Sequence, residues 1–219
     1  MNIAGMTDHT LLKPQATEKD IVALCHEAQQ HKFATVCVNP TYVQTAAKLL
    51  HGTGIGVAAV VGFPLGATFT EVKVQEVFMV KALGGKEVDM VINIGWAKSG
   101  NWRGVEQDIV RVVEAAHGCG LLIKVIIETC LLTEDEKKTV AEIVKRAGAD
   151  YIKTSTGFAG GGATVEDVLN LKAWVGEGVK VKASGGIRTR EFALELIQAG
   201  AERLGTSAVV APTGVKDKE

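Results

Sequence analysis

Cysteine is scarce in this sequence, and charge of neither sign predominates. The four cysteines, Cys25, Cys37, Cys119 and Cys130, form no CxxC pair and are too few for a disulfide scaffold, so we expect a reducing compartment. The 24 lysines and arginines nearly balance the 25 aspartates and glutamates, which leaves a net charge of -1. This balance provides no basic surface for nucleic acid or for an anionic membrane. The expected partners are therefore small molecules and copies of the same chain.

Long hydrophobic runs are also missing. Residues 1–6 lack the basic segment and the apolar stretch of a signal peptide, and the longest uncharged apolar run, residues 55–65, is too short to span a bilayer as a helix. We therefore expect no membrane partner and a cytoplasmic location. Only four prolines stand against 25 glycines, and 47% of the residues are hydrophobic. This composition suits one compact domain over residues 1–219 with many tight junctions.

Short runs rich in β-branched residues alternate with helical patterns along the whole chain, which is typical of βα units in a parallel sheet. The runs cover residues 6–12, 35–39, 56–63, 88–95, 121–128, 151–156, 179–184 and 202–206. Eight βα units in a chain of this length predict an α/β protein with the (β/α)8 TIM-barrel architecture.

Local signals predict where the intervening helices begin and end. Thr17, Thr133 and Thr164 are expected N-caps, with a capping box from Thr133 to Glu136, and Pro40 fits a first helical turn. Glycines that end a helix in the left-handed conformation are expected just before the strands. They are Gly84, Gly85, Gly118, Gly148 and Gly200.

Lys153 lies in the middle of the sixth run, where a charge needs an explanation. A central strand of a parallel sheet is covered on both faces, so its ammonium group must point into protein or into a site. The alternative is a lysine at a strand end whose ammonium group reaches water. Because side chains alternate along a strand, Lys153 shares its face with Tyr151 and Ser155 and opposes Ile152.

The same alternation directs other polar side chains toward the barrel interior, where a purely structural barrel would place branched apolar residues. The residues with this parity are Asp89, Asn93, Lys124, Glu128, Lys180, Lys182 and Ser184. An interior with several charges argues against a Lys153 that merely reaches water.

Amine chemistry would require Lys153 to be neutral. Burial and a neighbouring cation both lower the pKa of a lysine, and a neutral lysine forms a Schiff base with a carbonyl group. Lys182 is the best candidate for that neighbour, and Lys124 is the second. Asp89 could relay protons through water or act as an ion-pair partner of a lysine, and the two roles are compatible.

Two glycine-rich segments follow the last two runs, in the loops that bind phosphate in many barrels. Glycines let backbone N–H groups approach an anion, and a following helix adds its positive end. The alternative is two ordinary tight turns. The residues concerned are Gly185, Gly186 and Arg188 after the seventh run, and Gly205, Thr206 and Ser207 after the eighth.

Other patterns carry no separate chemistry. Residues 54–59 match GxGxxA but precede a strand, and residues 95–100 are followed by Asn101 instead of the lysine of a P-loop. The five histidines show no metal-ligand spacing, so we expect neither a metal nor a cofactor. Cys37 lies in a strand and could face the pocket, although an inert buried thiol is the simpler interpretation.

Seven segments resemble, in order, the deoxyribose-phosphate aldolase family of class I aldolases with a (β/α)8 barrel. They are DHTLL at 8–12, VCVNP at 36–40, VVGFP at 60–64, EVD at 87–89, LIKVIIET at 122–129, IKTSTG at 152–157 and KASGGIR at 182–188. The resemblance implies reversible cleavage of 2-deoxy-D-ribose 5-phosphate into acetaldehyde and D-glyceraldehyde 3-phosphate. It also implies a homodimer or homotetramer.

The resemblance further assigns roles to residues of this chain. Lys153 matches the Schiff-base lysine, Lys182 the lysine that perturbs it, and Asp89 the proton-relay aspartate. We expect an imine between Lys153 and the C1 aldehyde, and we place the bond that breaks at C3–C4. The implied substrate-binding residues are Asp8, Cys37, Lys124, Gly157, Gly185, Gly186, Arg188, Gly205, Thr206 and Ser207.

Two features depart from the family pattern. Phe158 follows Gly157, where some members place a lysine near the phosphate, so phosphate binding here is expected to depend more on backbone groups. Residues 214–219 include no tyrosine, which some members use at this end to assist proton transfer. Proton abstraction would then depend on Asp89, Lys182 and water.

Two alternatives stay open at this stage. One is another Schiff-base barrel, such as a different sugar-phosphate aldolase or a transaldolase. The other is a non-catalytic barrel that binds sugar phosphates, although binding alone needs no pair of inward lysines beside a carboxylate.

Overall fold

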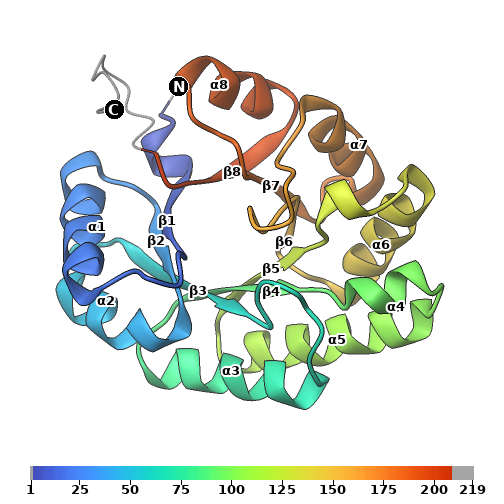
Figure 1. Cartoon of the computed structure of the whole chain (residues 1–219), viewed down its shortest axis with the longest axis horizontal. Coiled ribbons are helices and arrows are strands. Elements are labelled where there is room, and N and C mark those ends of the chain that lie inside the picture. Colours follow the sequence, from blue (N-terminus) through green and yellow to red (C-terminus); the bar gives the residue numbers. More distant parts are fainter. Residues whose placement is uncertain (1, 209–219) are drawn as a thin grey trace.

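Eight parallel strands close into a barrel in the order of the chain (Figure 1), in a computed structural model that describes residues 2–208. The strands are β1 (Thr7–Leu11), β2 (Thr35–Val38), β3 (Gly56–Val61), β4 (Glu87–Val91), β5 (Leu122–Ile126), β6 (Tyr151–Lys153), β7 (Lys180–Ser184) and β8 (Ala201–Thr206). Pairing of β1 with β8 closes the ring. The predicted (β/α)8 barrel is confirmed.

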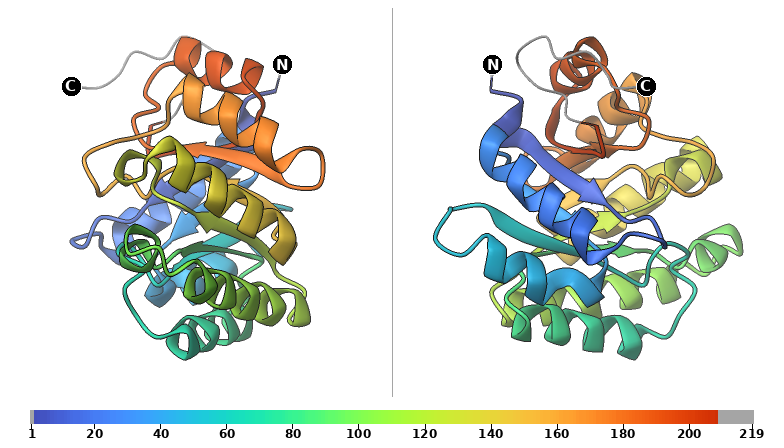
Figure 2. Two further views of the ribbon diagram at one scale, coloured as in Figure 1. Left: turned by 90° about the vertical axis from the view of Figure 1, so that its right-hand side faces the viewer. Right: turned by 60° about the vertical axis from the view of Figure 1, so that its left-hand side comes forward.

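Helices form the outer layer of the barrel and follow the strands in turn (Figures 1 and 2). The α-helices are α1 (Glu18–His31), α2 (Val43–Leu49), α3 (Thr70–Ala82), α4 (Ile94–Lys98), α5 (Trp102–Gly118), α6 (Glu134–Ala147), α7 (Val165–Val175) and α8 (Arg190–Gln198). Short 3-10 turns are η1 (Ala4–Met6), η2 (Pro40–Tyr42) and η3 (Thr129–Leu131). Within residues 2–208, no helix has the length and apolar character needed to cross a membrane.

All eight predicted strands are present, but six end earlier than expected, and the fourth and sixth differ most, by four and three residues. The fourth ends at Val91 because Asn93 turns the chain into α4, where its side chain accepts a hydrogen bond from Trp96 N at 3.1 Å. Asn93 is therefore an N-cap and not a strand residue. The sixth ends at Lys153, so the nucleophile candidate is the last residue of its strand.

The predicted helix caps are largely correct. Thr17 and Thr133 form capping boxes, with Asp20 and Glu136 respectively, and Thr164 accepts a hydrogen bond from Asp167 N. Among the glycines, Gly84, Gly148 and Gly200 have positive φ angles, whereas Gly85 and Gly118 do not. Gly118 instead ends α5 in a helical conformation, and the left-handed residue is Gly120, at a φ of 66°.

The apolar core fills the layer between the barrel and the helices. Helix α5, for example, buries Val105, Ile109, Val112 and Ala116 against it, which is the stripe of an amphipathic helix. The barrel interior is divided differently. A small apolar cluster of Leu12, Cys37, Ala58 and Val60 occupies the side of β1, β2 and β3. The charged side chains of the interior come from β1 and from β4 to β8.

A buried ion pair outside the barrel joins α3 to α5. Lys73 Nζ lies 2.6 Å from Asp108 Oδ2 and 2.8 Å from the carbonyl oxygen of Val91, and both side chains are almost fully buried. Each charge has a partner, so this lysine is structural. It shows that burial alone does not mark a lysine of this chain as chemically active.

Candidate active site

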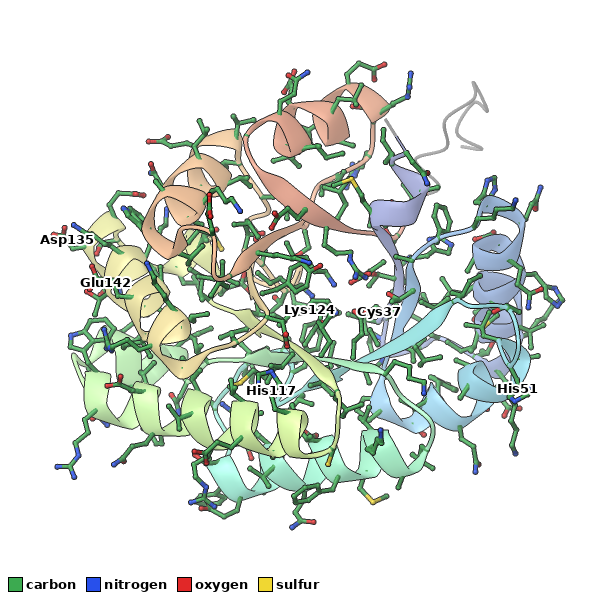
Figure 3. The ribbon with its side chains drawn as sticks, turned by 180° about the vertical axis from the view of Figure 1, so that it is seen from behind. Cys37, His51, His117, Lys124, Asp135 and Glu142 are labelled. Atoms are coloured by element: carbon green, nitrogen blue, oxygen red, sulfur yellow. The ribbon has the colours of Figure 1, made fainter. Side chains whose placement is uncertain are left out.

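Strand register brings the interior charges together. Asp89 of β4 is the direct neighbour of Lys124 of β5, and Lys153 of β6 is the direct neighbour of Lys182 of β7. Figure 3 shows Lys124 and Cys37 near the centre of the barrel. Neighbouring strands lie about 4.8 Å apart, so inward-pointing side chains of paired residues are close enough to contact each other.

Asp89 is the centre of this charged cluster. Its Oδ2 accepts hydrogen bonds from Lys153 Nζ and Lys182 Nζ, both at 2.7 Å, and its Oδ1 accepts one from Lys124 Nζ at 2.7 Å. Asp89, Lys124 and Lys182 are fully buried, and Lys153 is 3% exposed. One carboxylate therefore serves three lysines.

A second carboxylate supports the cluster from β1. Asp8 pairs with Lys182, lies 2.6 Å from Arg203 Nη1 and accepts a hydrogen bond from Thr35 Oγ1 at 2.7 Å. Gly205 leaves the space that Lys182 needs, because a Cβ atom there would lie 3.1 Å from Lys182 Cε. A side chain at that position would displace the lysine.

The electrostatics of the cluster separate the three lysines. Burial opposes ionisation of Lys124 and Lys182, but the carboxylates of Asp8 and Asp89 outweigh it and raise the pKa of both ammonium groups. Burial also opposes ionisation of the two aspartates, yet the surrounding cations hold the pKa of each carboxyl below its ordinary value. These four groups are charged near neutral pH.

Lys153 differs from the other two lysines. Burial lowers its pKa and the positive charge of Lys182 lowers it further, while Asp89 alone only partly compensates. Of the three lysines inside the barrel, it is the one whose pKa falls below the ordinary value. Burial also lowers the pKa of Lys73, which lies outside the barrel in its ion pair with Asp108. The neutral amine is therefore most accessible at Lys153.

A cavity of about 370 Å³ opens above Lys153 at the carboxyl end of the barrel. Its lining consists of Thr10, Leu11, Leu12, Lys13, Lys153, Thr156, Gly157, Phe158, Ser184, Gly185, Gly186, Ile187, Arg188, Gly205, Thr206 and Ser207. All seven residues predicted for the glycine-rich loops and for Gly157 are on this surface. Lys153 is the one member of the charged cluster that reaches it, so the cavity and the amine form a single site.

The loop after β6 is fixed to its neighbours on both sides. Glu128, buried two residues after the end of β5, accepts hydrogen bonds from the backbone N–H and the hydroxyl group of Thr156. Farther along the loop, Gly162 lies against Gly185, where a Cβ atom on Gly162 would be 2.4 Å from the carbonyl oxygen of Gly185. The loops that line the cavity therefore have little freedom to separate.

Phe158 gives the rim of the cavity an apolar edge. Its ring packs edge-to-face on Phe63, with 5.3 Å between the ring centroids. This places an aromatic pair where the family pattern allows a lysine. The cationic side chains at the lining are instead Lys13 and Arg188.

Three predicted substrate-binding residues are not at the cavity surface. Asp8 and Lys124 lie in the charged cluster below it, fully buried. Cys37 is fully buried in the apolar part of the interior, and burial raises the pKa of its thiol to about 11. Its thiol is therefore protonated at neutral pH, in agreement with the inert interpretation.

The sequence argument missed two members of the cluster. Glu87 lies 2.6 Å from Lys124, and Arg203 contacts both Glu87 and Asp8. The signal was available, because Glu87 is two residues before Asp89 in β4 and Arg203 two before Gly205 in β8. Alternation alone gives both side chains the inward parity.

Two expectations concern a metal ion and the end of the sequence. Among residues 2–208, no group of three or more metal-ligating side chains is placed to hold an ion. His9 is buried against Phe33 and contacts Glu27 Oε2 at 2.7 Å. Residues 214–219, which include no tyrosine, and the helix expected after Ser207 lie outside the described residues.

Comparisons with known proteins show similarity in sequence and in structure. A model of the DeoC/LacD family aldolases matches residues 3–215. A deoxyribose-phosphate aldolase from Desulfitobacterium hafniense is 76% identical over 210 residues, which cover 96% of each chain. One from Bacillus mycoides is 54% identical over 211 residues, covering 96% of this chain and 94% of its own. The tetrameric deoxyribose phosphate aldolase from Aeropyrum pernix has a TM-score of 0.89 at 35% identity, over 95% of this chain and 88% of its own.

Proposed function

The chain belongs to the DeoC/LacD family of aldolases, and on this premise we propose that it cleaves 2-deoxy-D-ribose 5-phosphate reversibly through a Schiff base on Lys153. The products are acetaldehyde and D-glyceraldehyde 3-phosphate. The names of the relatives support the substrate, and the geometry of the charged cluster supports the mechanism.

One observation carries the choice of nucleophile. Lys153 is the interior lysine that both lines the cavity and has a lowered pKa. Lys124 and Lys182 are fully buried below it, with raised pKa values. An attacking amine must be neutral and must reach the carbonyl carbon, and Lys153 meets both requirements.

The reaction begins when the neutral amine of Lys153 adds to the C1 aldehyde. The carbinolamine loses water to form an iminium ion. The hydroxyl group at C3 then gives up its proton as the C2–C3 bond breaks, and the bonding electrons move into the iminium to form an enamine. Protonation of the enamine at C2 and hydrolysis by water release acetaldehyde and restore Lys153.

The position of the broken bond corrects the expectation made from the sequence. Acetaldehyde contains two carbons, C1 and C2, and the glyceraldehyde phosphate contains C3 to C5. Cleavage between C3 and C4 would leave three carbons on the enzyme, so that expectation is wrong. The bond between the α and β carbons of the imine is also the one whose electrons the iminium can accept.

We assign the proton transfers to Asp89 and Lys182. Lys182 shares Asp89 Oδ2 with Lys153, so an ammonium donor and a carboxylate acceptor lie beside the reacting nitrogen. A proton can pass between the nitrogen, Asp89 and water without crossing an apolar region. Between proton transfers, Asp89 is the ion-pair partner of the lysines, so the two roles are compatible.

We assign the phosphate group to the glycine-rich loops after β7 and β8. Gly185, Gly186 and Gly205 present backbone groups at the cavity lining, and Arg188 lies beside them. Because α8 begins just after the first loop, its N-terminus adds a favourable field for an anion. Phe158 supplies no charge, and Lys13 is the further cationic side chain at the lining among residues 2–208.

Borohydride trapping tests the proposal. The protein is incubated with acetaldehyde and borohydride, digested, and analysed by mass spectrometry. We expect an ethyl group on the peptide that contains Lys153, and neither trapping nor turnover in Lys153→Leu. A label on another lysine, or no label on the wild-type protein, would contradict the assignment.

The same preparation separates the two alternatives. Assays with several phosphorylated sugars identify another aldolase or a transaldolase by its products. A non-catalytic sugar-phosphate barrel would bind deoxyribose 5-phosphate without being trapped. Comparing turnover of deoxyribose with that of its 5-phosphate measures how far the phosphate site contributes.

We also propose that the protein is a homo-oligomer that acts in the cytoplasm. The tetrameric Aeropyrum pernix relative supports the first point, and the four unpaired cysteines are consistent with the second. Light scattering of the purified protein distinguishes a monomer from a dimer or a tetramer.

A further inference from the structure

Six interior side chains form a closed ring in which anions and cations alternate. From Asp89 the ring passes through Lys124 (2.7 Å), Glu87 (2.6 Å), Arg203 (3.4 Å), Asp8 (2.6 Å) and Lys182, which returns to Asp89 at 2.7 Å. Every member contacts two neighbours of opposite charge. Such a ring is unusual in the interior of a barrel, where layers of branched apolar residues are the norm.

The charges of the ring cancel. Its three cations and three carboxylates sum to zero, and Lys153 is attached from outside through its single contact with Asp89 Oδ2. A protonated Lys153 is therefore an uncompensated fourth cation in a buried site. Because an unbalanced charge is costly in a poorly solvated interior, the neutral amine is the state that leaves the cluster balanced.

Two members of the ring, Glu87 and Arg203, lie on the side away from the cavity, because Glu87 precedes Asp89 in β4 and Arg203 precedes the cavity residue Gly205 in β8. Their side chains are 11% and 12% exposed. Arg203 also lies over the ring of Tyr151, with its guanidinium carbon 5.6 Å from the centroid. The two side chains touch the ring partners and not the reacting amine, so any effect on Lys153 must act through the charge of the cluster.

We propose that Arg203 and Glu87 are positioning residues that set the protonation state of Lys153 by balancing the charge of this ring. The proposal rests on the Schiff-base function of Lys153. Removing the cation of Arg203 leaves the ring with one excess negative charge, which favours a protonated Lys153. Removing the anion of Glu87 leaves one excess positive charge, which favours the neutral amine.

Other titratable groups around Lys153 are accounted for on every strand. Cys37 of β2 is neutral because burial raises the pKa of its thiol to about 11, and the interior positions of β3 are Ala58 and Val60. The charged or titratable groups that face the site are Asp8 of β1, Glu87 and Asp89 of β4, Lys124 of β5, Glu128 after β5, Tyr151 of β6, Lys182 of β7, Arg203 of β8, and Lys13 and Arg188 at the cavity. Lys180, at the exposed start of β7, lies beside the Tyr151 ring. Substitution of Arg203 or Glu87 therefore changes the net charge of the ring and leaves the other charged groups in place.

The test is a cycle of Arg203→Met, Glu87→Gln and the double variant, read as the pH at which borohydride trapping of acetaldehyde on Lys153 is half maximal. We expect this pH to rise by about one unit in Arg203→Met and to fall by a similar amount in Glu87→Gln. The double variant restores the balance and should return to the wild-type value. Arg203→Lys keeps the charge and should also stay near it.

Opposite shifts that cancel are the signature of charge, since loss of packing or of rigidity would affect both single variants alike. Suppose that the wild-type protein is trapped at Lys153, but the pH of half-maximal trapping shifts in the same direction in both single variants or does not shift. That result would overturn this inference and leave the Schiff-base assignment intact. A wild-type protein that is not trapped would instead contradict the proposed function. If Arg203→Met does not fold, the comparison of Glu87→Gln with the double variant decides the question. The pH of half-maximal trapping should then be lower in Glu87→Gln than in the double variant.

Discussion

Glu128 holds Thr156 by two hydrogen bonds to one carboxylate oxygen, from the backbone N–H at 3.1 Å and from the side-chain hydroxyl group. Glu128 has a φ angle of 54°, a left-handed conformation that costs a residue with a side chain roughly 1–2 kcal/mol. Thr156 lies at the cavity, three residues after Lys153 in the chain. The contact therefore connects the ends of β5 and β6 at the reacting centre.

Thr156→Val should weaken substrate binding more than it slows the chemical step. It removes the hydroxyl donor from a buried carboxylate, which should lower the free energy of unfolding by about 1.5–3 kcal/mol. The loop that lines the cavity loses a fixed contact, so we expect a higher KM for deoxyribose 5-phosphate and a smaller change in kcat. Steady-state kinetics and urea denaturation measure the two effects.

Thr139→Val is the matched control. Thr139 is half-buried on α6, and its hydroxyl group donates to the carbonyl oxygen of Asp135. This variant should change the free energy of unfolding by less than about 0.5 kcal/mol and leave KM unchanged. Equal effects of the two substitutions would show that the Glu128–Thr156 contact has no special role.

Lys182→Leu should shift the pH dependence of imine formation to higher pH. The positive charge of Lys182 lowers the pKa of Lys153, so its removal raises that pKa, and a higher pH is needed to obtain the neutral amine. A rise of about one pH unit would reduce the neutral fraction roughly tenfold below the midpoint. Trapping rate against pH measures the shift, and turnover should also fall.

Lys180→Leu controls for the loss of a lysine from the same strand and the same face. Lys180 is exposed at the start of β7, with its Nζ 5.7 Å from the centre of the Tyr151 ring. Its removal should leave the pH profile in place. No shift in Lys182→Leu, or the same shift in both variants, would refute the perturbing role of Lys182.

Gly162→Ala should separate the loops around the phosphate. The added Cβ atom would lie 2.4 Å from the carbonyl oxygen of Gly185, so one backbone segment must move, at a cost of roughly 1–3 kcal/mol. We expect KM for deoxyribose 5-phosphate to rise, while the slower reaction of unphosphorylated deoxyribose changes less. Kinetics with both sugars provide the measurement.

Gly178→Ala is the control for this change, because a Cβ atom on Gly178 would meet no atom within 4 Å. It should leave both substrates unaffected. If Gly162→Ala altered the two sugars to the same extent, the loop contact would not be specific to the phosphate end of the cavity.

Asp108→Asn should destabilise the protein strongly without changing the mechanism. It leaves the buried ammonium group of Lys73 without its anion, and loss of one partner of a buried ion pair costs about 3–5 kcal/mol. Chemical denaturation measures this loss, and trapping at Lys153 should persist in the folded fraction.

Glu71→Gln tests the same pair of helices at the surface. Glu71 and Arg111 also join α3 to α5, at 3.9 Å, but both side chains are more than half exposed. The cost should be below about 1 kcal/mol. A similar loss from both variants would contradict the distinction between buried and exposed pairs.

Local patterns were enough to identify every strand of the barrel. Period-two alternation and turn residues are properties of neighbouring positions, and they placed all eight strands and gave Lys153, Lys182, Lys124 and Asp89 their inward parity. Strand ends were less accurate, because Asn93 leaves its strand to cap a helix that the pattern of the run did not reveal. The predictions of glycine C-caps were only partly correct, because the local pattern did not show that Gly120, and not Gly118, adopts the left-handed conformation after α5.

The sequence by itself determined the eight-stranded architecture, the interior lysines and the glycine-rich loops, because each depends on spacing along one segment. The tertiary structure decided which charges touch. Closing the barrel brings Asp8 from β1 to Lys182 and Arg203 from β7 and β8, across nearly the whole chain, and encloses them where partners control ionisation. Only in that enclosure do Lys124 and Lys182 become fixed cations, while Lys153, with one shared carboxylate oxygen and an open cavity above it, has a lowered pKa.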